Sequence, residues 1–394
     1  MKLQKVLAGV MVAALALTVA PVSSVRAADG VPIDEAHFPD EVFREYVSEN
    51  FDGDRNGALS DEEIMMTTDI YVEGQGISTL KGIEYFTALR ELYCYDKQLT
   101  TLDVSGCTAL TNLDCSGNQL TTLDVSKNTT LTDLYCYGNQ LTTLDVSGCT
   151  ALERLHCYFN ELTTLDVSGC TALTDLFCYR NQLTTLDVSK NTALEQLDCS
   201  SNQLTTLDVS GCTALTDLNC SGNQLTTLGV SGCTALKTLD CRFNQITALD
   251  VSGCTALERL DCRINQLTGL DLSSNANLEE FYGGGNQFTE VDVSALTNLK
   301  EYDGTLDTER GVLVYGPSDL PELTPDKTIK VGEKVTFKVK KKPASMEGFV
   351  QGEVVSVKVK GKKVIVKGKA PGTVTVMAYN KKGKELGSWV VKVE

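Results

Sequence analysis

The sequence predicts a solenoid of short parallel strands as its main fold, with a helical cap before it and a small antiparallel β-sandwich after it. Three observations predict this: a 21-residue repeat that fills the middle of the chain, a twelve-residue acidic loop before the repeats, and alternating apolar and polar residues after them. One such repeat cannot bury its own apolar face, so successive copies must stack on one another. The length of 394 residues allows two or three domains.

The first 27 residues have the features of a secretory signal peptide. Lys2 and Lys5 form a basic start, residues 6–20 are an apolar run, and residues 25–27 (VRA) form a small-residue cleavage pattern. The apolar run is too short to span a bilayer as a helix. A buried N-terminal strand is the alternative interpretation. We expect a mature protein that is secreted and extracellular, or associated with the cell surface, without a transmembrane anchor.

Residues 28–66 predict a helical cap that contains a calcium-binding loop. Apolar residues recur at helical spacing from Val42 to Phe51, and the stretch DGDRNGALSDEE follows at residues 52–63. This stretch matches the EF-hand calcium loop at each ligand position. We expect a structural calcium ion; a polar helix–turn–helix that has lost its metal is the alternative. The expected ligands are the side chains of Asp52, Asp54, Asn56 and Glu63, the carbonyl of Ala58, and Ser60 through a water molecule.

Residues 67–315 contain about eleven repeats, including atypical copies at both ends. Their consensus is LxxLxCxxNxLxxLDVSx[CN]Tx, a spacing typical of leucine-rich repeats, in which each unit contributes one short strand to a parallel sheet on the concave side. A row of asparagines from Asn118 to Asn286 is expected to hydrogen-bond the backbone where each strand turns. The regular copies start at Leu89, Leu110, Leu131, Leu152, Leu173, Leu194, Leu215, Leu236 and Leu257, and a degenerate copy starts at Leu278.

All fifteen cysteines occupy two positions of the repeat. Nine lie in the strand, where leucine is usual, and six lie in the connector, where Asn128, Asn191 and Asn275 also occur. A buried free cysteine behaves as a small apolar residue, and an odd number leaves at least one thiol unpaired in a monomer. We expect two structural ladders of free thiols, although an exported chain also permits disulfides or a redox role. The spacing does not match Cys/His zinc sites.

Residues 316–325 contain three prolines and predict a linker to the last domain, residues 326–394. In that domain, apolar and polar residues alternate between glycine turns, which predicts an antiparallel β-sandwich of about seven short strands. The domain has 17 lysines and 6 acidic residues, whereas residues 1–325 have 18 basic and 46 acidic residues. This acidic bulk argues against nucleic acid as a partner. The basic domain is expected to be a soluble sandwich with charged edges, or to contact an anionic polymer or the acidic part of its own chain.

The repeat with its cysteine row resembles that of the internalins, bacterial surface proteins, and in particular their cysteine-ladder members. The stretch GISTLKGIEYFTAL at residues 76–89 is similar to the 22-residue internalin repeat, and GKAPGTVTV at residues 368–376 resembles a bacterial immunoglobulin-like domain. The resemblance covers nearly the whole mature chain. It implies an immunoglobulin-like C-terminal domain and a secreted or cell-surface adhesin. The LPxTG wall-attachment signal of anchored internalins is not expected here, because LPELT at residues 320–324 precedes a folded domain.

The candidate ligand-binding residues flank the inward leucine and cysteine of each strand, where side chains are expected to face outwards on the concave side. Other repeats carry serine or glycine at the same positions, so the fold does not require aromatic residues there. Clustered aromatic and arginine side chains are typical of binding surfaces; strand propensity is the alternative explanation. The candidates are Tyr93, Tyr95, Tyr135, Tyr137, His156, Tyr158, Phe159, Phe177, Tyr179, Arg180, Arg242 and Arg263.

These features predict a non-enzymatic adhesin that binds a protein or a glycan on a host or neighbouring cell. Catalysis has little support, because the chain has only two histidines, His37 and His156, and no nucleophile motif or phosphate loop. The alternative is a structural cell-wall-associated protein whose basic C-terminal domain contacts an anionic wall polymer.

Overall fold

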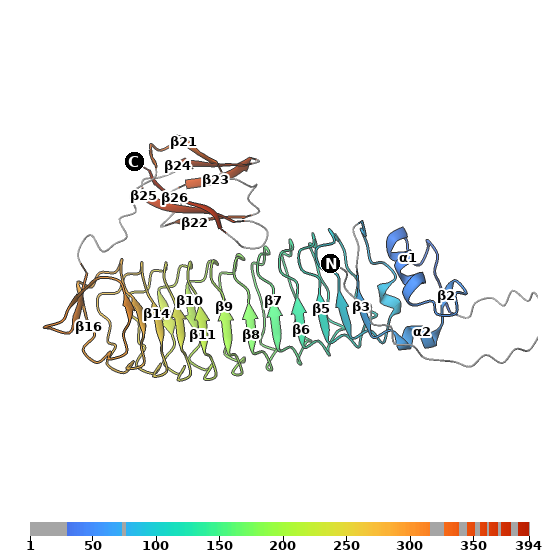
Figure 1. Cartoon of the computed structure of the whole chain (residues 1–394), viewed down its shortest axis with the longest axis horizontal. Coiled ribbons are helices and arrows are strands. Elements are labelled where there is room, and N and C mark those ends of the chain that lie inside the picture. Colours follow the sequence, from blue (N-terminus) through green and yellow to red (C-terminus); the bar gives the residue numbers. More distant parts are fainter. Residues whose placement is uncertain are drawn as a thin grey trace, which may run out of the picture.

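The main body of the protein is an elongated solenoid of stacked turns (Figure 1). The structure is a computed structural model that describes residues 30–72, 76–315, 327–338, 345–350, 355–360, 362–368, 372–379 and 385–393. The signal peptide predicted at residues 1–27 and the linker predicted at residues 316–325 lie outside the described residues.

One short strand from each turn joins a twelve-stranded main sheet. Neighbouring strands are parallel and pair equivalent residues of successive repeats, as Leu155 pairs with Leu176. The predicted parallel solenoid of about eleven turns is confirmed. Along the sheet the strands are β3 (Asp69–Tyr71), β4 (Glu91–Tyr93), β5 (Asn112–Asp114), β6 (Asp133–Tyr135), β7 (Arg154–His156), β8 (Asp175–Phe177), β9 (Gln196–Asp198), β11 (Asp217–Asn219), β13 (Thr238–Asp240), β14 (Arg259–Asp261), β15 (Glu280–Tyr282) and β17 (Glu301–Tyr302).

The side chains that repeat along the solenoid form one continuous apolar core. In a typical turn Leu155, Cys157, Leu162, Val167 and Cys170 are all fully buried. All fifteen cysteines are free and buried, as expected for two ladders inside the stack. Because each strand alternates its side chains, the central leucine of a strand faces this core and the two flanking residues face away from it.

The ladder asparagines connect each turn to the turn before it. Asn181 accepts a hydrogen bond from the backbone N–H of Leu162 at 3.0 Å, and its amide donates to the carbonyls of Cys157 at 3.1 Å and Cys178 at 3.0 Å. The same three contacts recur at Asn160 and at Asn202. Each asparagine therefore satisfies three backbone groups that the turn leaves without a partner inside the core.

Either cysteine or asparagine can fill the connector position, because both are small hydrogen-bond donors. The thiol of Cys170 lies 3.4 Å from the carbonyl oxygen of Val146 one turn back. The amide of Asn191 donates to the carbonyls of Val167 at 2.9 Å and Cys170 at 2.8 Å. The amide oxygen of Asn191 is itself buried without a hydrogen-bond partner. A thiol at this position satisfies a carbonyl and leaves no buried acceptor unpaired.

Smaller sheets lie outside the main one. On the connector side, β10 (Thr206–Asp208) and β12 (Thr227–Gly229) form a parallel pair. At the C-terminal end of the solenoid, β16 (Glu290–Asp292), β19 (Val312–Val314) and β18 (Thr305–Asp307) form an antiparallel sheet in that order. Leu313 of this sheet is fully buried and belongs to the solenoid core, so these strands close its end.

Two helices and a short strand pair cover the N-terminal end of the solenoid. They are β1 (Val31–Pro32), α1 (Glu41–Asn50), β2 (Ala58–Leu59) and α2 (Asp61–Met66), and the 3-10 helix η1 (Ile83–Tyr85) follows in the first turns. Phe43 and Val47 of α1 are buried in the solenoid core. Asp40 caps α1 by accepting from Phe43 N, and its other oxygen accepts from Ser78 N at 2.7 Å. The Asp40 carboxylate thus caps the N-terminus of α1 and also hydrogen-bonds to the first repeats.

Seven strands form two sheets near the C-terminus. One sheet has the order β20 (Lys327–Ile329), β26 (Glu385–Val393), β25 (Gly372–Tyr379) and β22 (Ser345–Val350). The other has the order β21 (Lys334–Lys338), β24 (Lys363–Gly368) and β23 (Val355–Lys360). The predicted antiparallel arrangement is wrong for one pair, because β20 runs parallel to β26. The immunoglobulin-like assignment stays a prediction. None of the helices described for the chain is both long and apolar enough to cross a membrane.

Candidate binding surface

Each strand of the main sheet presents two side chains on the side away from the core, which we call the open face. In the nine strands from β4 to β14 they are the last residue of the strand and the residue two positions later, and the cysteine between them is buried. In β7 these residues are His156 and Tyr158, on either side of fully buried Cys157. Burial raises the pKa of Cys157 to about 12. His156 and Cys157 therefore point to opposite sides of the sheet and do not form a nucleophile pair.

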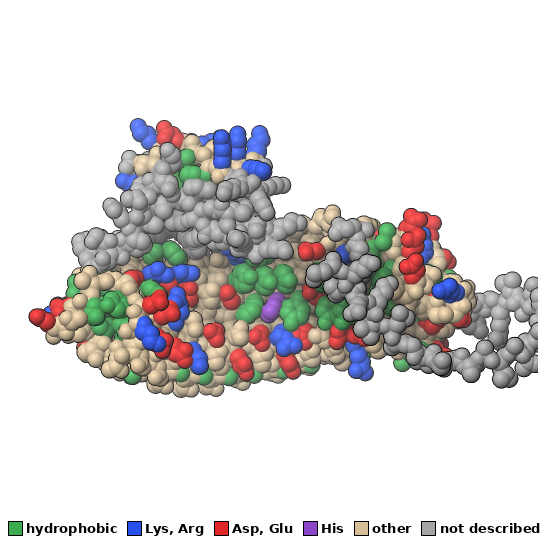
Figure 2. All heavy atoms as spheres, viewed as in Figure 1, with side chains coloured by type: hydrophobic (Ala, Val, Ile, Leu, Met, Phe, Trp, Pro, Cys, Tyr) green, Lys and Arg blue, Asp and Glu red, His purple; other side chains and the backbone are tan. Residues whose placement is uncertain are grey.

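Six rings gather on three neighbouring strands, β6 to β8, in a patch that we call the aromatic zone. Figure 2 shows hydrophobic side chains around a histidine on this face. Tyr137, Tyr158 and Tyr179 form one column, with ring centroids 4.4 and 4.3 Å apart and interplanar angles of 10° and 8°. The aromatic zone consists of this column and of a second one formed by Tyr135, His156 and Phe177.

In the second column, His156 stacks on Phe177 at 4.5 Å and meets the ring of Tyr135 edge-on at 4.9 Å. Burial lowers the pKa of His156, so its ring is neutral at neutral pH. Burial likewise raises the pKa of Tyr158, with smaller contributions from the neighbouring tyrosines. The aromatic zone is therefore an uncharged surface in a solenoid that is otherwise strongly acidic.

Phe159 and Arg180 extend the aromatic zone at the turns that follow the strands. The ring of Phe159 lies 5.8 Å from that of Tyr158 and 5.6 Å from that of Tyr179. The guanidinium carbon of Arg180 lies 4.6 Å from the centroid of Phe159, a cation–π contact. Eight of the twelve predicted ligand-binding residues are thus brought together.

Tyr93 and Tyr95 lie apart from this zone, because Asp114 and Ser116 occupy the intervening turn. Tyr93 instead stacks on Tyr71, with centroids 4.7 Å apart and an interplanar angle of 5°. Tyr71 was not among the predicted residues. The sequence could have indicated Tyr71, because it directly follows Ile70, the inward-facing residue of the atypical first repeat, as Tyr93 follows Leu92.

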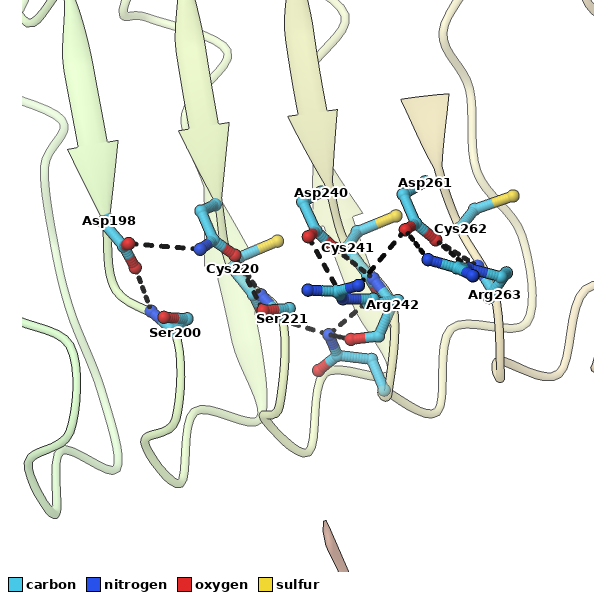
Figure 3. Close-up of polar contacts among 12 residues, drawn as sticks. Asp198, Ser200, Cys220, Ser221, Asp240, Cys241, Arg242, Asp261, Cys262 and Arg263 are labelled. Carbon is cyan, nitrogen blue, oxygen red and sulfur yellow. Dashed lines mark hydrogen bonds and ion pairs between the residues drawn. The ribbon is translucent and has the colours of Figure 1, made fainter. Parts of the chain in front are cut away.

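Arg242 and Arg263 are engaged with the carboxylates of Asp240 and Asp261, the second of which is fully buried (Figure 3). Arg263 donates to both oxygens of Asp261, at 2.9 and 2.5 Å, and Asp261 is fully buried. Arg242 lies 3.2 Å from Asp240 and 3.6 Å from Asp261. Burial raises the pKa of Asp240 to about 6, against the opposing effect of Arg242. Both guanidinium groups thus compensate carboxylates within the sheet, and less of their charge is available to a ligand than the sequence suggested.

The predicted metal ligands converge only in part. Carboxylate oxygens of Asp52, Asp54 and Glu63 lie within 4.8 Å of one another. Glu63 also accepts from Gly53 N at 2.6 Å and from Ser60 N at 2.8 Å. Three converging carboxylates are a donor set that suits a hard divalent cation.

The other predicted ligands of this loop take part in its internal hydrogen bonds. The Ser60 hydroxyl donates to Glu63, and the two residues form a capping box at the start of α2. The amide oxygen of Asn56 accepts from Ala58 N at 2.8 Å, while its amide nitrogen donates to Asp54 at 2.9 Å. Ala58 lies in β2, paired with Pro32.

A groove of about 1680 Å³ runs along the connector side and offers a competing surface. Its lining repeats threonine, leucine, aspartate and serine in successive turns, for example Thr143, Leu144, Asp145 and Ser147. A lining that is the same in each turn follows from the repeat itself. The aromatic zone differs from the equivalent positions of other turns, and we therefore place the candidate site there.

Comparisons with known proteins agree with this fold. Residues 192–232, 213–253 and 234–281 match a family model described as leucine rich repeats (2 copies). A search of curated proteins found no match. A solved leucine-rich-repeat protein of Leptospira interrogans is 23% identical with a TM-score of 0.55, covering 63% of this chain and 69% of that one, and it shows the fold.

Two solved proteins of Listeria monocytogenes are also similar to this chain. The functional domain of InlJ, which includes a cysteine ladder, is 28% identical with a TM-score of 0.45, and covers 94% of this chain and 100% of that one. The internalin InlF is 23% identical with a TM-score of 0.44, and covers 71% of this chain and 99% of that one. The matched family model shows that residues 192–281 of the chain contain leucine-rich repeats.

Proposed function

We propose that this protein is a secreted or cell-surface binding protein without enzymatic activity, which recognises a protein or glycan ligand on the open face of its main sheet. The aromatic zone carries the proposal. Six aromatic rings occupy positions where the turns on either side have Asp114, Ser116, Asp198 and Ser200, so the fold does not require them. Large, rigid side chains on a partly exposed surface supply contact area at low entropic cost. The resemblance of the repeat to that of internalins supports the same function.

The test is a binding screen against arrayed glycans and extracellular proteins. We expect the variant Tyr137→Ala/Tyr158→Ala/Tyr179→Ala to bind the ligands recovered with wild-type protein at least about tenfold more weakly, because truncating clustered aromatic contacts removes hot-spot energy. The matched control is Thr122→Ala/Thr143→Ala/Thr164→Ala, which changes three residues of the connector groove. Equal binding by the tyrosine variant, or loss of binding in the threonine control, would place the site elsewhere.

We also propose that the loop at residues 52–63 holds a structural calcium ion. Asp52, Asp54 and Glu63 are the residues that would bind it, since their carboxylates already converge. The loop joins α1, whose Phe43 and Val47 are in the solenoid core, to α2, whose Ile64 is also there. A cation that fixes the loop would therefore hold both helices against the first repeats.

We expect calcium to raise the melting temperature of the wild-type protein and a chelator to reverse this, because a ligand that binds only the folded state stabilises it by about 2.7 kcal/mol at one hundred times its Kd. Glu63→Gln removes one carboxylate and keeps a side chain that can complete the capping box. In this variant the calcium shift should disappear. Glu62→Gln is the control, since Glu62 lies outside the cluster. An identical calcium shift in Glu63→Gln would contradict the proposal.

The lysines of the three-stranded sheet β21–β24–β23 favour a second candidate function, contact with an anionic cell-wall polymer. Lys334 is paired with Lys367, and Lys338 and Lys360 are both paired with Lys363. All five are exposed, and the three strand sequences contain no acidic residue. Like charges opposite one another destabilise a sheet. A polyanion would compensate that repulsion. We assign the seven strands to an immunoglobulin-like domain as part of this proposal.

Co-sedimentation with purified bacterial cell walls tests this second function. Binding should fall steeply as sodium chloride is raised, because the contact is electrostatic and solvent-exposed. Lys338→Gln/Lys360→Gln/Lys363→Gln should abolish it. Lys81→Gln/Lys127→Gln/Lys190→Gln removes the same charge from exposed positions of the solenoid and serves as the control. Wall binding that is insensitive to salt, or equal in the two variants, would contradict the assignment.

A further inference from the structure

The turn after each of the ten strands from β4 to β15 in the main sheet contains a residue with left-handed backbone conformation, directly before the ladder asparagine or, after β4, before Lys97. At ten equivalent positions φ lies between 54° and 78°. Glycine adopts this conformation readily, whereas other residues adopt it at a cost in free energy. The ten residues are Asp96, Gly117, Gly138, Phe159, Arg180, Ser201, Gly222, Phe243, Ile264 and Gly285.

Four of these positions hold large side chains in a conformation that disfavours them: Phe159, Arg180, Phe243 and Ile264, which we call the edge row. A β-branched residue such as Ile264 at φ 54° is a particular outlier. Four other turns have glycine at the same place, so the solenoid forms without a side chain there. Strained residues persist where the surroundings or a function hold them, and binding sites are common locations.

The edge row borders the open face at two places. Phe159 and Arg180 contact each other beside the aromatic zone. Phe243 and Ile264 directly follow Arg242 and Arg263 in the chain. The Ile264 side chain lies close to Gly285, where an added Cβ would be 3.0 Å from it. All four residues keep part of their surface exposed. In the turns between the two places the edge-row position holds Ser201 and Gly222, and the residues directly before them are Ser200 and Ser221.

We infer that the edge row determines specificity, and that the partner is a polypeptide held at two places, Phe159–Arg180 and Phe243–Ile264. This rests on the proposed function of the open face. The two outer members, Phe159 and Ile264, are five repeats apart, a span of about 24 Å at ~4.8 Å per strand. About seven extended residues cover that distance at ~3.4 Å each. The small residues between the two places leave room for the middle of the segment.

The ring geometry favours a polypeptide over a glycan. A sugar packs its C–H groups against the face of an aromatic ring. Both faces of Tyr158 are covered, by Tyr137 at 4.4 Å and by Tyr179 at 4.3 Å. Tyr158, in the middle of the column, therefore offers only its ring edge to a ligand, and the edge row adds the apolar side chains of Phe243 and Ile264. Ring edges and aliphatic groups suit the side chains of a polypeptide.

A phage-displayed library of random twelve-residue peptides, panned on the full chain, tests this inference. Selected peptides should bind Phe243→Gly/Ile264→Gly at least about tenfold more weakly than wild type. Ser201→Gly is the matched control, because it makes the same backbone change at a small residue, and it should bind as wild type does. The melting temperature of the double variant should be no lower than that of Ser201→Gly. Phe243→Asn/Ile264→Asn, which also tolerates the left-handed turn, should weaken binding equally.

The outcomes separate this inference from the proposed function. Peptides that require Tyr158 yet bind the double glycine variant like wild type would overturn the role of the edge row and leave the proposed function intact. A melting temperature below that of Ser201→Gly would also overturn it, because the side chains would then serve packing. Recovery of a Tyr158-dependent glycan and of no such peptide would overturn the polypeptide partner. Ligands that bind the Tyr137→Ala/Tyr158→Ala/Tyr179→Ala variant unchanged would contradict the proposed function itself.

Discussion

Replacing Asn181 by leucine will destabilise the solenoid by about 2–6 kcal/mol, since a buried N–H that loses its only partner costs about 1–3 kcal/mol and each of two further lost hydrogen bonds costs about 0.5–1.5 kcal/mol. The side chains are similar in size, so the change acts mainly through hydrogen bonding. The Leu162 N–H would remain buried without a partner, whereas the carbonyls of Cys157 and Cys178 would each lose one of two hydrogen bonds and keep the one from Asn160 or Asn202. Urea unfolding followed by circular dichroism measures the loss.

Asn286→Leu is the matched control for this prediction. Asn286 makes the equivalent three contacts in a terminal repeat, but it is partly exposed, so water can replace the lost hydrogen bonds. Its effect should be clearly smaller. A loss below about 1 kcal/mol for Asn181→Leu would show that the ladder contributes no more than an ordinary hydrogen bond, which is worth about that amount.

The fifteen cysteines will resist alkylation in the folded protein and react only on unfolding. All of them are buried. Burial raises the pKa of Cys157 to about 12, and that of connector Cys170 also to about 12, so the reactive thiolate is scarce at pH 8. For Cys157 and Cys170 we expect labelling at least ~10³-fold slower than for an exposed thiol, because a pKa higher by about three units lowers the thiolate fraction by that factor even before access is considered.

Iodoacetamide labelling followed by mass spectrometry measures this rate, with Thr163→Cys as the exposed control in the same repeat as Cys157. In urea without reductant, all fifteen native thiols should be labelled. Fewer than fifteen would mean that disulfides form in the protein, and the ladders would then not be free thiols.

The solenoid was predictable because its information is local and repeated. The spacing of Leu152, Leu155 and Cys157 predicts a short strand with an inward face, and the repetition of that spacing forces each strand to pair with the next. The same repetition predicted the asparagine ladder, since a polar residue that recurs inside an apolar stack must satisfy backbone groups. In the C-terminal domain the pattern is only alternation, which does not specify strand direction. The parallel pairing of β20 with β26 was missed for that reason.

The candidate site was predictable in its residues but not in its chemistry. Alternation along a strand placed Tyr158 and Arg263 on the open face from the sequence alone. Whether a ring presents its face or its edge depends on the residue one turn away, and the tertiary stacking covers both faces of Tyr158. Whether an arginine is available to a ligand depends on its partners, and Arg263 is paired with the buried carboxylate of Asp261.

The sequence by itself determined that the chain stacks into a leucine-rich-repeat solenoid, which side chains face inwards, and where aromatic residues interrupt the pattern. These follow from periodicity, which is a property of neighbours along the chain. Only the tertiary structure decided that Phe159 and Ile264 occupy left-handed turns that glycine occupies in other repeats, that the tyrosines cover one another, and that the arginines compensate buried aspartates. Those outcomes depend on contacts between turns and on burial, because hydrogen bonding and ionisation respond to the packed surroundings and not to the order of residues alone.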